Sequence, residues 1–251
     1  MLLAGFRVPR EVCRFKEKVW LSTCLHSVDY SGATAPGFHR LLLPERSCNL
    51  EGASPLRQCL WEVSLATSLL LVCAGTTASA RTGGFPSPDE PLDEAGRRDA
   101  RGLTLDARFR AHLARSPSRA AIETAAAIDV AAETVPALAD VDHGRWAGRS
   151  FEDIAAAEPD ALSRWIADPT EGAPDGESLH LAQRRIGQWL DAIATVDEPR
   201  CAITHAMTIR AALAHALSLP LSAALAIDIA PLSQVRLSFN GRWRLQALVP
   251  A

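Results

Sequence analysis

The apolar positions of residues 63–251 form two kinds of pattern: short continuous runs, and longer stretches in which they recur every three or four residues. A continuous run predicts a strand buried on both faces, whereas the longer spacing predicts an amphipathic helix. The predicted strands are Ser68–Cys73, Ala111–Arg115, a short strand near Thr134, Cys201–Thr204, Gln234–Phe239 and Arg242–Leu248. Strands that alternate with helices predict an α/β fold, a three-layer α/β/α sandwich around a mostly parallel central sheet.

The helical stretches lie between these runs and have recognisable beginnings. One helix is predicted to begin after Asp93 as its N-cap and another at Pro117, since proline suits the first helical turn. The others are predicted at Phe151–Glu158, Asp160–Ala167, Leu179–Thr195 and Met207–Leu217. In Leu179–Thr195 the spacing of the apolar residues predicts one buried face, formed by Leu181, Ile186, Trp189, Leu190 and Ile193. Gly75–Pro91 and Leu138–Ser150 are predicted to be loops, and Asn240-Gly241 a hairpin turn.

Residues 1–62 differ from the rest in composition, because they contain both lysines of the chain and four of its six cysteines. Those cysteines lack the close pairing of a zinc module, and charged residues such as Glu11 and Lys16 interrupt the early apolar runs that a targeting peptide would need. We expect residues 1–62 to be a poorly ordered extension, or leader sequence translated from an early start codon with Val63 as the true initiator. Residues 63–251 are then predicted to form one domain.

The run from Val63 to Gly75 resembles the apolar part of a signal peptide. It is shorter than the ~20 residues that span a bilayer, and no basic segment directly precedes it. We therefore interpret it as a central strand. Because Cys73 and Cys201 do not suggest a disulfide framework, the expected location is cytoplasmic.

The overall charge argues against polyanionic partners. The formal net charge is −3 with a pI near 6.2, and like charges do not cluster. This composition does not suit a protein that binds nucleic acid or an anionic membrane surface. We also predict no metal site and no cofactor.

Three predicted strands end in residues that can carry chemistry. The first is followed by Cys73-Ala74-Gly75-Thr76-Thr77, a later one by His205, and the second by Ser116-Pro117-Ser118-Arg119. In a parallel sheet the ligand site lies at the carboxyl ends of the strands. Arg119 is predicted near the N-terminus of a helix, which favours anions.

The motifs LLLVCAGTT, EPLDEAGRRDARGL, SPSRAAIETA, LADVDHGRWAGRSFEDI, DGESLHLAQRR and CAITHAMTIRAAL follow one another in this order. In order and spacing they resemble the histidine phosphatase superfamily, with its phosphoglycerate mutase-like fold, over residues 66–248. The compact length is most similar to bacterial broad-specificity phosphatases and α-ribazole phosphatase. The resemblance implies a phosphorylated small molecule as partner and is compatible with a homodimer.

In that family a histidine in an Arg-His-Gly motif accepts the phosphoryl group, aided by two arginines, a second histidine and an acid. The resemblance implies that Arg119 is the second arginine, His205 the second histidine and Asp140 the acid. Gly75 matches the glycine, and Thr76 follows it as a further candidate phosphate ligand. Fixed positive donors of this kind stabilise the equatorial oxygens in phosphoryl transfer.

The nucleophile motif itself departs from the family, since Cys73 and Ala74 stand where it has arginine and histidine. A methyl group accepts no phosphoryl group, and loss of a covalent nucleophile costs on the order of 10⁶ in rate in a measured hydrolase. Cys73 as a nucleophile is disfavoured against a packed thiol, because Ser79 occupies the position where cysteine phosphatases have an arginine. Arg81, in the following loop, is a candidate to restore the missing charge.

Two hypotheses follow. In the first, the chain is a pseudoenzyme, an impaired or non-enzymatic phosphatase-like domain that binds a phosphorylated metabolite through Arg119 and His205. In the second, it is an active phosphomonoesterase with a relocated mechanism, in which His205 or Asp140 activates water. The residue that separates the two hypotheses is Ala74.

Overall fold

The computed structural model describes residues 67–251. Our expectations for residues 1–62, and for Val63 as an initiator, lie outside the described residues. All that follows concerns the described part of the chain.

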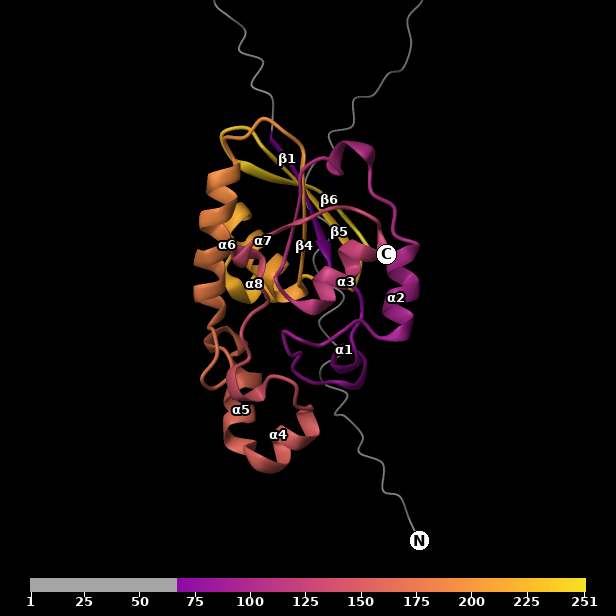
Figure 1. Ribbon diagram of the computed structural model, residues 1–251. Helices are drawn as coiled ribbons and strands as arrows, with labels where there is room; N and C mark the ends of the chain where they lie inside the picture. Colours follow the sequence, from indigo (N-terminus) through magenta and orange to yellow (C-terminus); the bar gives the residue numbers. More distant parts are fainter. Residues whose placement is uncertain (1–66) are drawn as a thin grey trace, which may run out of the picture. The chain divides into compact units, whose positions relative to one another are not determined.

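A six-stranded sheet forms the centre of the domain, in the order β3-β2-β4-β1-β5-β6 (Figure 1). Its strands are β1 (Thr67–Cys73), β2 (Leu113–Arg115), β3 (Glu133–Thr134), β4 (Arg200–Thr204), β5 (Gln234–Phe239) and β6 (Trp243–Val249). Strands β3, β2, β4 and β1 pair in parallel, whereas β5 is antiparallel to both β1 and β6. The prediction of an α/β fold with a mostly parallel sheet is confirmed.

Helices lie on both faces of this sheet (Figure 1). They are α1 (Ala78–Thr82), α2 (Glu94–Arg101), α3 (Arg119–Ala127), α4 (Phe151–Ala157), α5 (Pro159–Ala167), α6 (Leu179–Ile193), α7 (Ala206–Leu217) and α8 (Leu221–Leu225). Short 3₁₀ turns occupy Ala107–Phe109, Pro136–Leu138, Gly144–Trp146 and Pro169–Glu171.

The helices differ from the expectations in four respects. Helix α3 begins at Arg119 instead of Pro117, because the Ser118 side chain accepts from the Ala121 amide and caps the helix. Helix α1 lies inside the predicted loop, and α8 was not predicted. Leu181 is exposed, and Ala182 joins the buried face of α6 instead.

Strand β1 shows why a continuous apolar run marks the centre of the sheet. Leu69 and Leu71 pack into the core cluster that contains residues of α6 and α7, whereas Leu70 and Val72 pack into the cluster with α2 and α3. Neither face is exposed to water along Leu69–Cys73, and every position of this stretch is apolar. The carboxyl end of β1 therefore lies at the centre of the sheet, between β4 and β5.

A third, smaller cluster lies beyond the carboxyl ends of the strands. It consists of Phe85, Trp146, Ile154, Leu162 and Ala173. Ile154 belongs to α4 and Leu162 to α5, and these helices lie apart from the sheet (Figure 1). We call residues 151–167 the cap, because they form part of the wall of the pocket described below.

Residues 67–251 contain no helix that combines the length and the hydropathy needed to cross a membrane.

Candidate functional site

A pocket of about 700 Å³ opens at the carboxyl ends of the parallel strands. Its walls come from segments that follow β1, β2 and β4, from the loop before the cap, and from the cap itself. The residues on which the argument depends are Cys73, Ala74, Gly75, Thr76, Phe85, Asp89, Ser116, Ser118, Ala120, Asp140, Asp142, His143, Phe151, Trp165 and His205. This volume suits a small organic molecule.

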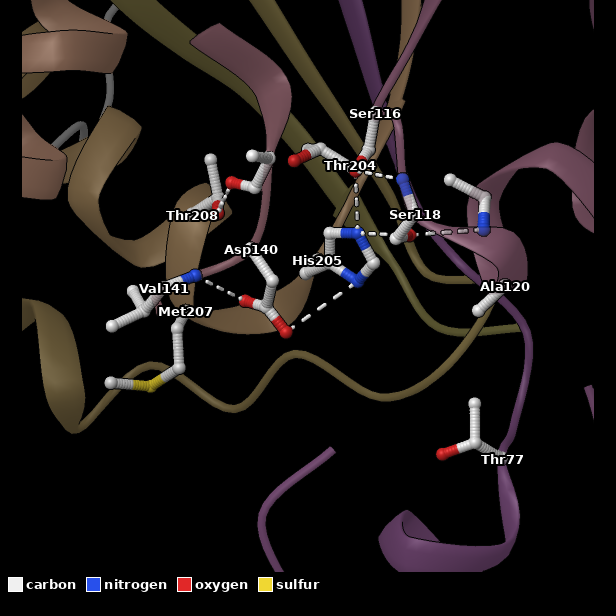
Figure 2. A network of polar contacts seen from close by, with 12 residues as sticks. Thr77, Ser116, Ser118, Ala120, Asp140, Val141, Thr204, His205, Met207 and Thr208 are labelled. Atoms are coloured by element: carbon white, nitrogen blue, oxygen red, sulfur yellow. Dashed lines mark hydrogen bonds and ion pairs between the residues drawn. The ribbon is translucent and has the colours of Figure 1, made fainter. Parts of the chain in front are cut away.

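His205 is the centre of the polar network in this pocket (Figure 2). It follows β4 directly and is the N-cap residue of α7. Its Nε2 lies 2.9 Å from the Oγ of Ser118 and 2.9 Å from the Oγ of Ser116. Its Nδ1 faces the carboxylate of Asp140, with 3.6 Å between Nδ1 and Oδ2.

The orientation of Asp140 is fixed by the backbone around it. Its Oδ1 accepts from the Val141 amide at 2.9 Å, so Oδ2 is left to face His205. The guanidinium of Arg185 donates to the carbonyls of Ala137 and Ala139, and the Glu177 carboxylate binds the same guanidinium at two points. This clamp holds the segment that bears Asp140.

Cys73 is the last residue of β1 and Ala74 follows it directly. Both line the pocket, and both are at most 5% exposed. Burial raises the pKa of the Cys73 thiol to about 12, and the nearby Asp140 carboxylate acts in the same direction. The thiol is therefore protonated at neutral pH, and it is the thiolate that acts as a nucleophile.

Arg119 and Arg81 do not line the pocket. The Arg119 guanidinium pairs with Glu123 at 2.9 Å and its side chain is 56% exposed. Arg81 pairs with Asp93 at 2.7 Å and is 55% exposed. The structure thus does not bring either predicted phosphate ligand to His205: each guanidinium is largely exposed and pairs with a carboxylate that does not line the pocket.

The residue at the head of α3 that does line the pocket is Ala120 (Figure 2). The lining residues, all within the described part of the chain, include no arginine or lysine but three carboxylates: Asp89, Asp140 and Asp142.

An aromatic wall closes the side of the pocket near the cap. Phe85 packs edge-on against Trp165 and Phe151, with ring centroids 5.0 and 4.9 Å apart, and against the ring of His143 at 5.1 Å. Burial lowers the pKa of His143, so its imidazole favours the neutral form. The wall therefore offers apolar surface and no fixed charge.

The structure brings His205, Asp140, Gly75 and Thr76 to one pocket, as the motif order suggested. Within the strand-end segment Ser116-Pro117-Ser118-Arg119, sequence reasoning assigned a role to Arg119 but none to Ser116 or Ser118. Their position between a strand and a helix N-terminus was the available signal. No group of three or more His, Cys, Asp or Glu side chains in residues 67–251 is arranged to hold a metal ion.

Comparison with known proteins places this geometry in context. A family model described as the histidine phosphatase superfamily (branch 1) matches residues 69–249. A protein of Mycobacterium tuberculosis (strain H37Rv), called a bifunctional protein, is 30% identical over 137 residues, which are 51% of this chain and 37% of the relative. The chain thus spans little more than a third of the length of that relative.

Solved structures share the fold. A mycobacterial glucosyl-3-phosphoglycerate phosphatase complexed with VO3 has a TM-score of 0.66 and 24% identity, over 74% of this chain and 100% of the other. A phosphoserine phosphatase from Entamoeba histolytica has a TM-score of 0.61 and 18% identity, over 73% and 96%. The latter is a histidine-to-alanine mutant in complex with phosphoserine.

Proposed function

The chain belongs to the histidine phosphatase superfamily, branch 1, and we propose that its domain does not transfer phosphoryl groups and instead holds a small ligand of little or no negative charge. The observation that carries this proposal is the set of side chains that line the pocket where β1 ends and α3 begins. Ala74 and Ala120 present methyl groups there, and Cys73 presents a neutral thiol.

The absence of a nucleophilic side chain at position 74 supports the first half of the proposal. Phosphoryl transfer through an enzyme intermediate needs a group that bonds to phosphorus, and Ala74 has none. The raised pKa of Cys73 argues against the thiol as a substitute. The proposal thus keeps one claim of the pseudoenzyme hypothesis, the loss of phosphatase activity.

The charge of the pocket supports the second half. The mutant from Entamoeba histolytica is complexed with phosphoserine although a histidine has been replaced by alanine, so one missing histidine does not by itself prevent binding in this fold. In the present chain the lining residues include no arginine or lysine, whereas Asp89, Asp140 and Asp142 are there. A phosphomonoester dianion would gain no charge-assisted contacts from fixed cations and would face these carboxylates.

The test restores what the pocket lacks. We would assay p-nitrophenyl phosphate hydrolysis by the full chain and by the Cys73→Arg/Ala74→His/Ala120→Arg variant, and titrate both with inorganic phosphate by calorimetry. The wild type should show no turnover above buffer and no binding at millimolar phosphate, whereas the variant should bind phosphate. Arg119→Ala is the matched control and should leave the wild-type phosphate titration unchanged, because Arg119 lies on the outer surface.

Wild-type turnover that His205→Ala abolishes would overturn the proposal in favour of a relocated phosphatase mechanism. Phosphate binding by the wild type that Arg119→Ala abolishes would overturn it in favour of a phosphometabolite site. Both outcomes are measured on the wild type and on single variants, so they can be obtained even if the triple variant does not fold.

A further inference from the structure

The network around His205 has the arrangement of a nucleophile, a base and an orienting acid. The Ser118 hydroxyl lies 2.9 Å from Nε2, and the Asp140 carboxylate faces Nδ1 on the other side of the same ring at 3.6 Å (Figure 2). From these contacts we propose that Ser118, His205 and Asp140 hydrolyse an uncharged carboxylic ester in this pocket. The inference uses the pocket of the proposed function but does not depend on whether phosphate binds there.

The imidazole is held in the orientation that a general base requires. With its proton on Nδ1, facing Asp140, His205 leaves Nε2 free to accept a proton from a serine hydroxyl. The 3.6 Å separation exceeds hydrogen-bond length, and contacts of this kind tighten as the imidazole becomes charged. The backbone amide of Val141 fixes the carboxylate that faces the ring.

Two serines compete for Nε2, and the geometry favours Ser118 as the nucleophile. Ser116 has no exposed surface, and its Oγ accepts from the Ser118 amide. Ser118 is 8% exposed and caps the nine-residue helix α3, so its Oγ lies at the positive end of the helix dipole. A partial positive charge there stabilises the alkoxide character that develops during attack.

The first turn of α3 also provides a donor for an oxyanion. The Arg119 amide donates to the Pro88 carbonyl, and the Ala121 amide donates to Ser118 Oγ. The Ala120 amide lies between these two and has no partner among the hydrogen bonds of residues 67–251. Ala120 also lines the pocket. An unpaired amide in a partly enclosed site is suited to a carbonyl oxygen that gains negative charge.

The rest of the pocket defines the substrate class. Phe85, Phe151 and Trp165 form an apolar wall that suits an aromatic or branched hydrocarbon group. The absence of arginine and lysine from the lining disfavours esters that carry a phosphate or carboxylate. An uncharged ester with one bulky apolar group meets both conditions.

The reaction balances without any further reactant than water. The Ser118 oxygen forms a bond to the carbonyl carbon while its proton passes to Nε2 of His205. The carbon–oxygen bond to the alcohol then breaks, and the alcohol leaves with that proton. A water molecule, deprotonated by the same nitrogen, attacks the acyl-serine and releases the carboxylic acid, which restores Ser118.

The test uses the full chain with p-nitrophenyl butyrate and with a fluorophosphonate that labels active serines. We expect measurable ester hydrolysis and a label on the peptide that contains Ser118. Ser118→Asn removes the nucleophile but keeps an N-cap residue, and it should reduce the rate by at least about 100-fold and abolish the label. His205→Gln should do the same, whereas Arg119→Ala, which changes an exposed side chain outside the pocket lining, should stay within about threefold of wild type.

The outcomes separate this inference from the proposed function. Ester turnover no greater than that of buffer would overturn it, and so would a rate that Ser118→Asn leaves intact or a label on Ser116. None of these results bears on phosphate turnover, which is measured with a different substrate.

Discussion

Ala74 and Ala120 place methyl groups in the wall of the pocket, one just after β1 and the other in the first turn of α3. Cys73, beside them, is a buried thiol whose pKa is raised to about 12. At the scale of single residues, these three side chains therefore add no charge to the pocket. The remaining reactive groups of the pocket gather around His205 instead.

The raised pKa of Cys73 leads to a prediction about its reactivity. Iodoacetamide alkylates the thiolate, and both burial and protonation keep Cys73 unreactive in the folded chain at pH 8. Peptide mass spectrometry should find Cys73 unmodified after a time that fully labels the chain in denaturant. Cys201, buried with its pKa also raised to about 12, is the internal control and should behave in the same way. Rapid labelling of Cys73 but not Cys201 would mark Cys73 as an activated thiol after all.

Strand-to-helix junctions bring the reactive groups of the site together at the scale of elements. Ser116 and Ser118 lie between β2 and α3, and His205 lies between β4 and α7. Since β2 and β4 are parallel neighbours, their carboxyl ends place these residues side by side. Helix α2 supports the third junction, after β1, by close contact with the backbone at Thr76.

That contact depends on the lack of a side chain at Gly96. A Cβ there would clash with the Thr76 carbonyl oxygen, which is backbone and has little freedom to move. Gly96→Ala should therefore lower stability by about 1–3 kcal/mol, the usual cost of overpacking, although alanine favours helices. Thermal or urea unfolding measures this change. Arg98→Ala, at an exposed position of the same helix, should change stability by less than about 0.5 kcal/mol, and equal effects of both substitutions would contradict the packing argument.

Stability is unevenly distributed over the described domain. The sheet has a core cluster on each face, whereas α4 and α5 contribute one buried residue each, Ile154 and Leu162, to the small third cluster. Regions with little buried apolar surface open locally at a lower free energy than global unfolding requires. The cap that walls the pocket therefore belongs to the less stable part of the domain.

Hydrogen exchange measures this difference directly. We expect the amides of β1 and β4 to exchange slowest and those of α4 and α5 at least about tenfold faster under native conditions, because cap opening does not require the sheet to open. Helix α6, which buries several side chains against the sheet, is the helical control and should exchange nearly as slowly as β1. Equal protection of α4 and β1 would mean that cap and sheet open as one unit.

Much of the fold could be predicted from the sequence, because local patterns encode it. The apolar run of β1 is continuous since both its faces are buried, and the capping residue Asp93 marks the start of α2. The Asn240-Gly241 turn joins β5 to β6, with Gly241 at a positive φ of 72°. Leu181 was one exception: its spacing fits the buried face, but its side chain is exposed.

The sequence by itself also determined that residue 74 offers no nucleophile, since an alanine side chain has none in any conformation. Only the tertiary structure decided which residue of the SPSR segment faces the pocket, because one step along a helix turns a side chain by about 100°. Arg119 therefore points to Glu123 on the outer surface while Ala120 lines the cavity. In the same way, the meeting of Ser118, His205 and Asp140 depends on strand order, which brings distant segments of the chain to one edge of the sheet.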